Sequence, residues 1–152
     1  MASHVDTVRE SILLKRSPHE VYSFWRCLEN LPVFMDHLQD VRKTGNLTYH
    51  WKAKAPLGTS VEWDAIITEE KADQLIRWTS KAGSRIENAG AVWFTEWEIN
   101  RKEPMCTLVE VEFYYKPPLG KVGVLIATIF GENPQQQVKD DLQKLKFHLE
   151  NE

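Results

Sequence analysis

The chain has few residues that crosslink or interrupt structure: two cysteines, seven glycines and seven prolines among 152 residues. Cys27 and Cys106 stand far apart with no partner spacing, which is unlike a disulfide framework or a zinc motif. The low glycine and proline content excludes collagen-like and low-complexity chains. Histidines and cysteines show no metal-ligand spacing such as HExxH or CxxC, so we expect no metal and no cofactor.

An excess of charge of one sign is also absent. Nineteen basic and 22 acidic residues leave a formal net charge of −3 at pH 7. Nucleic-acid-binding proteins usually carry a strong basic stripe, so we expect no nucleic-acid partner. The longest apolar stretch, residues 119–131, contains Lys121 and is too short to span a bilayer. The first residues lack the apolar segment of a signal peptide, which favours a cytoplasmic, reducing location.

Aromatic side chains are abundant: six Trp, six Phe and four Tyr. Hydrophobic residues make up 42% and charged residues 27%, which is typical of a soluble globular protein. A chain of this length forms one domain, residues 1–152, and buries about 68–70% of its unfolded surface. The aromatic excess suggests a large apolar cavity, and ordinary core packing is the alternative.

The first third of the chain predicts a strand and two short helices. Residues 5–16 alternate apolar and charged side chains, as a strand does. Ser17 can cap a helix that has Pro18 at its first position and Glu20 completing a capping box, and this helix runs to about Glu29. A second short helix then carries four apolar residues at helical spacing: Leu31, Phe34, Met35 and Leu38.

In residues 41–117 apolar and polar side chains alternate with a period of two, which predicts antiparallel strands with one solvent-exposed (wet) face and one buried face. Glu62 and Asp64 fall on the wet face, where we expect cross-strand lysines to pair with them. Residues 87–100 leave open whether Trp93 or Phe94 points inward. A final helix over about residues 119–149 has a kink or break at Pro134, because proline removes a hydrogen bond inside a helix.

Four phrases of the sequence resemble one family. They are residues 17–35, residues 50–67, residues 87–94 with Asn88-Ala89-Gly90, and residues 130–146. Together they resemble the START-like, helix-grip (SRPBCC) superfamily, in its polyketide cyclase/dehydrase and coenzyme-Q-binding START-type branch. The resemblance implies an α+β fold in which a curved antiparallel sheet of about six to seven strands wraps round a long C-terminal helix. It also implies an apolar tunnel between sheet and helix.

The inward strand positions and the two short helices supply candidate ligand contacts. Each of these residues could instead be ordinary core, but as a set they exceed what one helix needs for packing. Pockets that are apolar with a few polar groups are the usual form of small-molecule sites. The candidates are Trp25, Phe34, Met35, Tyr49, Trp51, Trp63, Trp78, Phe94, Phe113, Tyr115 and Phe130, with Tyr49, Ser80, Asn88 and Tyr115 as polar handles.

The superfamily contains carriers, receptors and enzymes on one scaffold, so the resemblance leaves the function open. We favour binding of a hydrophobic small molecule such as a polyketide, isoprenoid or lipid. The alternative is a polyketide cyclase, aromatase or dehydratase that acts on a poly-β-ketone chain. Asp36 and His37 are candidates for proton transfer, but neighbours in sequence usually point apart, and a solvated helix end is the simpler explanation.

A third interpretation is a subunit whose exposed aromatic residues bind another protein. If Phe94 points inward, Trp93 points outward together with Trp97, and exposed aromatic residues often mark an interface. This pattern predicts a weak homodimer.

Overall fold

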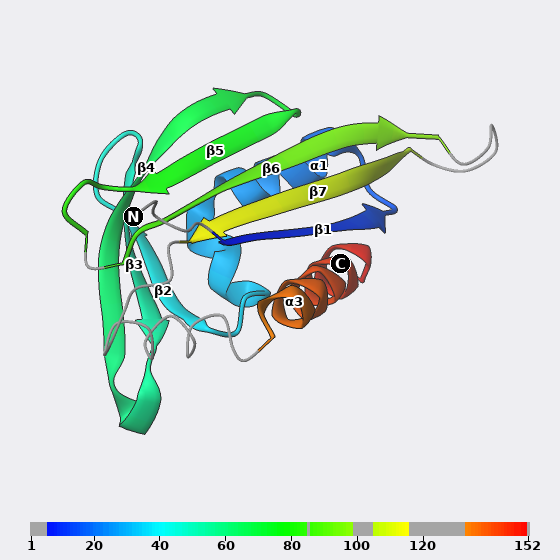
Figure 1. The fold of residues 1–152 in the computed structure, drawn as a ribbon. Helices are drawn as coiled ribbons and strands as arrows, with labels where there is room; N and C mark the ends of the chain where they lie inside the picture. Colours follow the sequence, from blue (N-terminus) through cyan, green and yellow to red (C-terminus); the bar gives the residue numbers. More distant parts are fainter. Residues whose placement is uncertain (1–5, 85, 99–104, 116–132, 152) are drawn as a thin grey trace.

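The computed structural model describes residues 6–84, 86–98, 105–115 and 133–151 (Figure 1). Strands and helices follow one another in the predicted order. They are β1 (Asp6–Leu14), α1 (Pro18–Arg26), the 3-10 helix η1 (Leu28–Val33), β2 (Leu38–Lys43), β3 (Thr48–Lys54), the short turn η2 (Pro56–Gly58), β4 (Ser60–Lys71), β5 (Leu75–Ser80), β6 (Asn88–Trp97), β7 (Cys106–Tyr115) and α3 (Pro134–Glu150).

Seven antiparallel strands form one sheet in the order β1-β7-β6-β5-β4-β3-β2. The sheet curls into a half-barrel, and β2, β3 and β4 turn away from the direction of the other strands (Figure 1). The register shifts between Ile67 and Glu69 in β4 and between Leu38 and Asp40 in β2, and such bulges bend a sheet. The α+β helix-grip architecture expected from the sequence is confirmed.

The start of α1 confirms the predicted cap. The Glu20 N–H group donates to Ser17 Oγ (3.2 Å), and the Ser17 hydroxyl donates to Glu20 Oε1 (3.1 Å). The helix ends at Arg26, earlier than predicted, and the amide of Asn30 donates to the carbonyl oxygen of Phe24 (3.0 Å). This side-chain contact satisfies a carbonyl group that the end of a helix leaves open.

The second predicted helix is wrong in type and in extent. Residues 28–33 form a 3-10 helix with Pro32 inside it, and proline cannot donate the hydrogen bond that a continued helix needs. Leu38, expected on that helix, is the first residue of β2 and pairs with Ala53 of β3. Pairing with the neighbouring strand therefore overrides the helical spacing of the apolar residues.

Helix α3 begins at Pro134, where the sequence predicted a kink or break. Asn133 caps it, since its Oδ1 accepts from the Gln136 N–H group at 3.1 Å. The predicted helical stretch before this point lies outside the described residues. The buried stripe of α3 matches the prediction: Val138, Leu142, Leu145 and Leu149.

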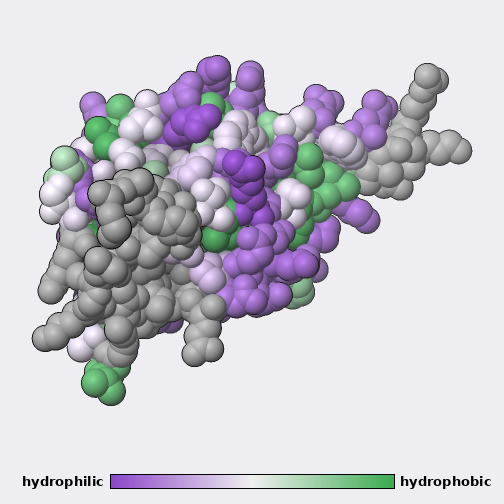
Figure 2. Space-filling model, viewed as in Figure 1, coloured by the Kyte–Doolittle hydropathy of each residue, from purple (hydrophilic) through white to green (hydrophobic). Residues whose placement is uncertain are grey.

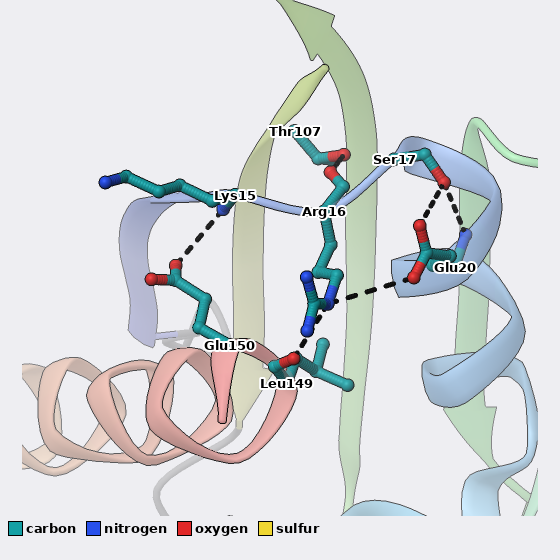
Figure 3. A network of polar contacts seen from close by, with 7 residues as sticks. All are labelled: Lys15, Arg16, Ser17, Glu20, Thr107, Leu149 and Glu150. Carbon is teal, nitrogen blue, oxygen red and sulfur yellow. Dashed lines mark hydrogen bonds and ion pairs between the residues drawn. The ribbon is translucent and has the colours of Figure 1, made fainter. Parts of the chain in front are cut away.

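Helix α3 packs against β1, and its outer side is hydrophilic (Figures 1 and 2). Its last turn is held by the segment that joins β1 to α1 (Figure 3). The Arg16 guanidinium donates to the Leu149 carbonyl (2.8 Å), and the Lys15 N–H group donates to Glu150 Oε2 (3.1 Å). The buried Thr107 hydroxyl of β7 donates to the Arg16 carbonyl (2.7 Å). These contacts join the edge of the sheet to the C-terminal end of α3.

None of the helices in the described ranges is both long and apolar enough to cross a membrane.

Candidate functional site

Four aromatic side chains from separate strands form a continuous row on the inner face of the sheet, which we call the aromatic row: Trp51 of β3, Trp63 of β4, Trp78 of β5 and Phe113 of β7. Trp51 and Trp63 are direct cross-strand partners, and their ring centroids lie 5.7 Å apart. Trp78 stacks on Trp51 at 6.3 Å and meets Phe113 edge to face at 5.9 Å. The predicted strand parity of the tryptophans is confirmed.

Gly90 makes room for the middle of this row. In the sheet it pairs with Trp78 on one side and Phe113 on the other. A Cβ atom at position 90 would lie 2.2 Å from Cζ2 of Trp78, closer than any real contact. A glycine in a strand often marks such a close approach. The indole of Trp78 therefore lies across β6 and reaches the aromatic ring of β7.

Helix α1 and the segment after it contribute a second aromatic cluster. The Trp25 ring lies 5.1 Å from Phe34 and 6.2 Å from Phe94, between centroids. Tyr22 meets Phe94 edge to face at 5.6 Å. Trp25, Phe34 and the adjacent Met35 are all buried. This cluster fills the space between α1 and the sheet.

Phe94 points inward, which resolves the alternative left open by the sequence. Phe94 is buried, whereas Trp93 is half-buried with the Arg77 guanidinium 5.2 Å from its ring centroid. Trp97 is exposed near the end of the same strand.

Three of the four predicted polar handles come together at the end of the aromatic row. Asn88 pairs with Tyr115 across β6 and β7, and the Asn88 N–H group donates to Ser80 Oγ (3.1 Å). All three line a pocket of about 380 Å³ at this rim of the sheet. Each of them lies two residues along its strand from a residue at the end of the row, namely Trp78, Gly90 or Phe113. The pocket therefore has a polar mouth beside the row, and the row residues themselves do not line it.

The fourth handle, Tyr49, lies elsewhere. Its ring is buried on the inner face of β3, and its hydroxyl oxygen accepts from Arg26 Nη1 at 2.8 Å. The same guanidinium forms an ion pair with Glu70 of β4. Helix α1 is thereby tied to β3 and β4 through one arginine.

The two predicted proton-transfer residues point to different partners on α3. Asp36 is exposed and forms an ion pair with Lys144. His37 is largely buried, and its Nδ1 lies 3.9 Å from Oδ2 of Asp141, longer than a hydrogen bond. Although Asp36 and His37 are adjacent in sequence, their side chains therefore contact different residues of α3.

Asp141 is the residue that sequence analysis missed. It is 3% exposed, and its Oδ1 accepts from the Gln137 side-chain amide at 2.9 Å. Burial raises the pKa of this carboxyl group to about 7 and lowers the pKa of His37 to about 4. The sequence does contain a signal for this buried carboxyl group, because Asp141 stands between Val138 and Leu142 within the apolar stripe of α3. The structure thus places a neutral imidazole beside a carboxyl group that titrates near neutral pH.

The solvent-exposed face of β3 and β4 carries a cluster of charged residues in which a histidine contacts the two predicted acids. His50 contacts both carboxylates, Asp64 Oδ1 through Nδ1 and Glu62 Oε1 through Nε2, each at 2.9 Å. These hydrogen bonds raise the pKa of His50. The predicted cross-strand register is confirmed, because Lys52 is the direct partner of Glu62, and His50 is an additional partner that the sequence analysis did not name. Within the described ranges, no group of three or more His, Cys, Asp or Glu could hold a metal ion.

Residues 14–143 match the family of polyketide cyclase / dehydrase and lipid transport proteins. The chain belongs to this family. An uncharacterized 17.2 kDa protein of Streptomyces lincolnensis, from the melC2-rnhH intergenic region, is 28% identical over 143 residues, which are 94% of this chain and 89% of that protein. A Deinococcus radiodurans protein of known structure is 30% identical with a TM-score of 0.75, over 95% of this chain and 97% of that one.

More distant structures share the fold. A START superfamily protein from Mycobacterium smegmatis has a TM-score of 0.69 at 13% identity, over 94% of this chain and 98% of that one. The di-domain ARO/CYC protein BexL has a TM-score of 0.64 at 16% identity, over 95% of this chain and 46% of that one. The START-like fold and the polyketide cyclase/dehydrase branch expected from the sequence are confirmed.

In this member of the polyketide cyclase/dehydrase and lipid transport family, nearly all the proposed ligand contacts are on the inner side of the sheet. Phe113 and Tyr115 are half-buried, and Phe130 lies outside the described residues. The other candidates are buried: Trp25, Phe34, Met35, Tyr49, Trp51, Trp63, Trp78 and Phe94. Their contact with a ligand stays a prediction.

Proposed function

We propose that the chain binds a hydrophobic small molecule, such as a polyketide, isoprenoid or lipid, along the inner face of the sheet. In this proposal residues 1–152 act as one ligand-binding domain. The observation that carries it is the position of the aromatic row. Its tryptophans belong to β3, β4 and β5, whereas α3 packs against β1 at the opposite edge of the sheet.

The row is a continuous set of aromatic rings of the kind on which an apolar ligand can stack. A buried aromatic side chain contributes about 150–250 Å² of contact area, and flat rings stack favourably on one another. A ligand with rings or a long apolar chain would gain this area. The polar pocket formed by Ser80, Asn88 and Tyr115 would suit its more hydrophilic end. The family's description, which includes lipid transport, supports the same interpretation.

An apolar fluorescent dye tests the proposal. Anilinonaphthalene sulfonate should bind at about one equivalent and quench tryptophan fluorescence, because several tryptophans lie in the row. Trp63→Phe should weaken binding while keeping an aromatic ring in the core, and Trp97→Phe, at an exposed site, should leave it unchanged. Native mass spectrometry of the protein from its own host should show a co-purifying apolar molecule. Equal dye binding by wild type and Trp63→Phe, with no such molecule, would contradict the proposal.

A second candidate function is cyclisation or dehydration of a poly-β-ketone, and the His37–Asp141 pair favours it. General acid–base catalysis needs a group whose pKa lies near the working pH, and burial gives Asp141 that property. Turnover of a model poly-β-ketone that is abolished in Asp141→Asn or His37→Ala, with dye binding retained, would support the enzyme. No turnover by the wild type would leave the binding function as the better description.

A further inference from the structure

Strand β6 is longer than the strand that covers one of its edges. Strand β5 begins at Leu75, which pairs with Trp93, so residues 94–97 of β6 extend past it (Figure 1). On its other edge β6 stays paired with β7 as far as Trp97, the partner of Cys106. Among the described residues, the end of β6 therefore has one edge without a neighbouring strand, and such an edge can pair with another chain.

The hydrogen-bonding pattern of the sheet shows which main-chain groups lie on this edge. The Phe94 N–H group donates to the Gln74 carbonyl oxygen at 2.8 Å, just before β5 begins. In an antiparallel sheet the N–H and C=O groups of every second residue face the same edge, so those of Glu96 and Glu98 face this one. No main-chain group in the described ranges pairs with them. Residues 95–98 thus form a free edge with unpaired donors and acceptors at Glu96 and Glu98.

The edge strand β1, by contrast, is covered. The Lys146 ammonium group of α3 donates to the Leu13 carbonyl oxygen at 3.0 Å, and the Gln135 side-chain amide donates to the Arg9 carbonyl oxygen at 2.5 Å. Proteins commonly cover the edge of a sheet in this way, because an open edge pairs with other chains. The free edge of β6 borders a cavity instead.

This cavity has a volume of about 650 Å³, within the usual range of binding pockets. Strand β6 forms one wall, and the start of α1 together with the turn between β4 and β5 forms the other. His19 Nδ1 and Asp73 Oδ1 lie 2.9 Å apart and join α1 to that turn. Leu75, Phe94 and Met105 supply apolar lining. The cavity therefore leaves room for a further chain beside β6.

Two kinds of side chain alternate along the free edge, because successive residues of a strand point to opposite faces. Glu96 and Glu98 lie on one face and are exposed, and neither forms an ion pair with a described residue. Thr95 and Trp97 lie on the other face. Trp97 is 47% exposed, and Met105, which precedes its cross-strand neighbour, is 49% exposed. An added strand would meet acidic groups at one set of positions and apolar surface at the other.

The charges decide which chain fits. If a second copy added the same edge, the acidic residues of the two copies would lie opposite one another, and like charges opposite each other destabilise a strand pair. A strand with Lys or Arg at these positions would instead form favourable cross-strand pairs with Glu96 and Glu98. Lys71 also lines the cavity, but it belongs to β4, on the wall across from β6.

We propose that the free edge of β6 binds an extended segment of a partner protein in which basic and apolar residues alternate. The segment adds to the sheet as a further strand: its main chain pairs with Glu96 and Glu98, its basic side chains meet their carboxylates, and its apolar side chains cover Trp97. Strand addition of this kind draws its affinity from main-chain hydrogen bonds and its specificity from alternate side chains. The proposal does not depend on the small-molecule site at the inner face of the sheet.

Two synthetic peptides test the charge preference: acetyl-Lys-Val-Lys-Val-Lys-Val-amide and its analogue with Glu in place of Lys. In calorimetric titrations of the full chain, the basic peptide should bind at least about tenfold more tightly, because favourable cross-strand charge pairs replace unfavourable ones. Glu96→Lys combined with Glu98→Lys should reverse this preference. Glu110→Lys, at an exposed position of β7 away from the free edge, should keep it.

Main-chain pairing is tested by N-methylation of the basic peptide at alternate amides. Methylation of the set that faces β6 should abolish binding, whereas methylation of the other set should preserve it. The Glu96 N–H group should also exchange more slowly with deuterium in the wild-type complex. This measurement decides if the double variant does not fold.

Equal binding by the two peptides, or equal binding by the two methylated forms, would overturn the proposal. So would the absence of binding by either peptide. The two glutamates would then only protect the edge from pairing with other strands. None of these results would affect the proposed function, because dye binding at the inner face is measured separately.

Discussion

Asp141→Asn should change the pH dependence of stability in a direction fixed by burial. The substitution removes a carboxyl group that is 3% exposed and keeps an amide of nearly the same size, which still offers an oxygen to Gln137. Burial raises the pKa of Asp141 from 3.8 to about 7 in the folded protein. The folded state therefore holds this proton where the unfolded state has lost it, so the free energy of unfolding falls as pH rises from about 4 to about 7.

The magnitude follows from the size of the shift. One pKa unit corresponds to about 1.36 kcal/mol, so a shift of roughly three units costs the folded state about 4 kcal/mol once Asp141 is ionised. Asp141→Asn removes this cost. At pH 8 the variant should be more stable than the wild type by several kcal/mol, and at pH 4 the two should be nearly equal.

His37 changes the free energy of unfolding with pH in the opposite direction to Asp141. Its folded-state pKa is lowered from 6.5 to about 4 by burial, so the unfolded state binds more protons between these values. Its stabilising contribution is present above about pH 6.5 and is lost as pH falls to about 4. The slopes of His37 and Asp141 nearly cancel in the wild type over this range. In Asp141→Asn only the His37 slope remains, and stability should rise by about 3 kcal/mol from pH 4 to 6.5.

Urea unfolding followed by tryptophan fluorescence at several pH values between 4 and 8 measures these slopes. Asp140→Asn is the matched control, because Asp140 precedes Asp141 on α3 and is exposed. It should follow the wild-type curve. If Asp141→Asn is less stable than the wild type at pH 8, the ionised carboxylate stabilises the fold through a protonated His37, and our assignment of a neutral imidazole is refuted.

Three further predictions concern packing, capping and association. Gly90→Ala should destabilise the fold by about 1–3 kcal/mol, because its Cβ atom clashes with the Trp78 indole. Trp78→Leu should relieve this clash, so the losses in unfolding free energy of the two substitutions, measured in urea, should not add in the double variant. Additive losses would contradict the prediction. Ser17→Ala should cost about 1 kcal/mol by removing the cap of α1, and an unchanged midpoint of thermal unfolding would argue against it. Trp93 and Trp97 should mediate a weak homodimer, and sedimentation that shows only monomer at high concentration would disprove it.

Local patterns in the sequence were sufficient to predict features that depend on near neighbours. Alternation with a period of two placed Trp51 and Trp63 on one face of a hairpin, because side chains of a strand point to opposite faces in turn. The cap at Ser17 was predictable because it needs only residues within one helical turn.

Only the tertiary structure decided the features that depend on distant residues. Phe94 rather than Trp93 points inward because β6 is paired on both sides, with β5 and with β7, and this pairing sets its register. His37 and Asp141 meet because α3 packs across the turn before β2, and their pKa values then follow from shared burial. Periodicity describes which way a side chain points within its own element. It contains no information on which element will cover that side chain. In this protein the covering elements determine the protonation of His37 and Asp141, and they determine whether a buried indole N–H group finds an acceptor.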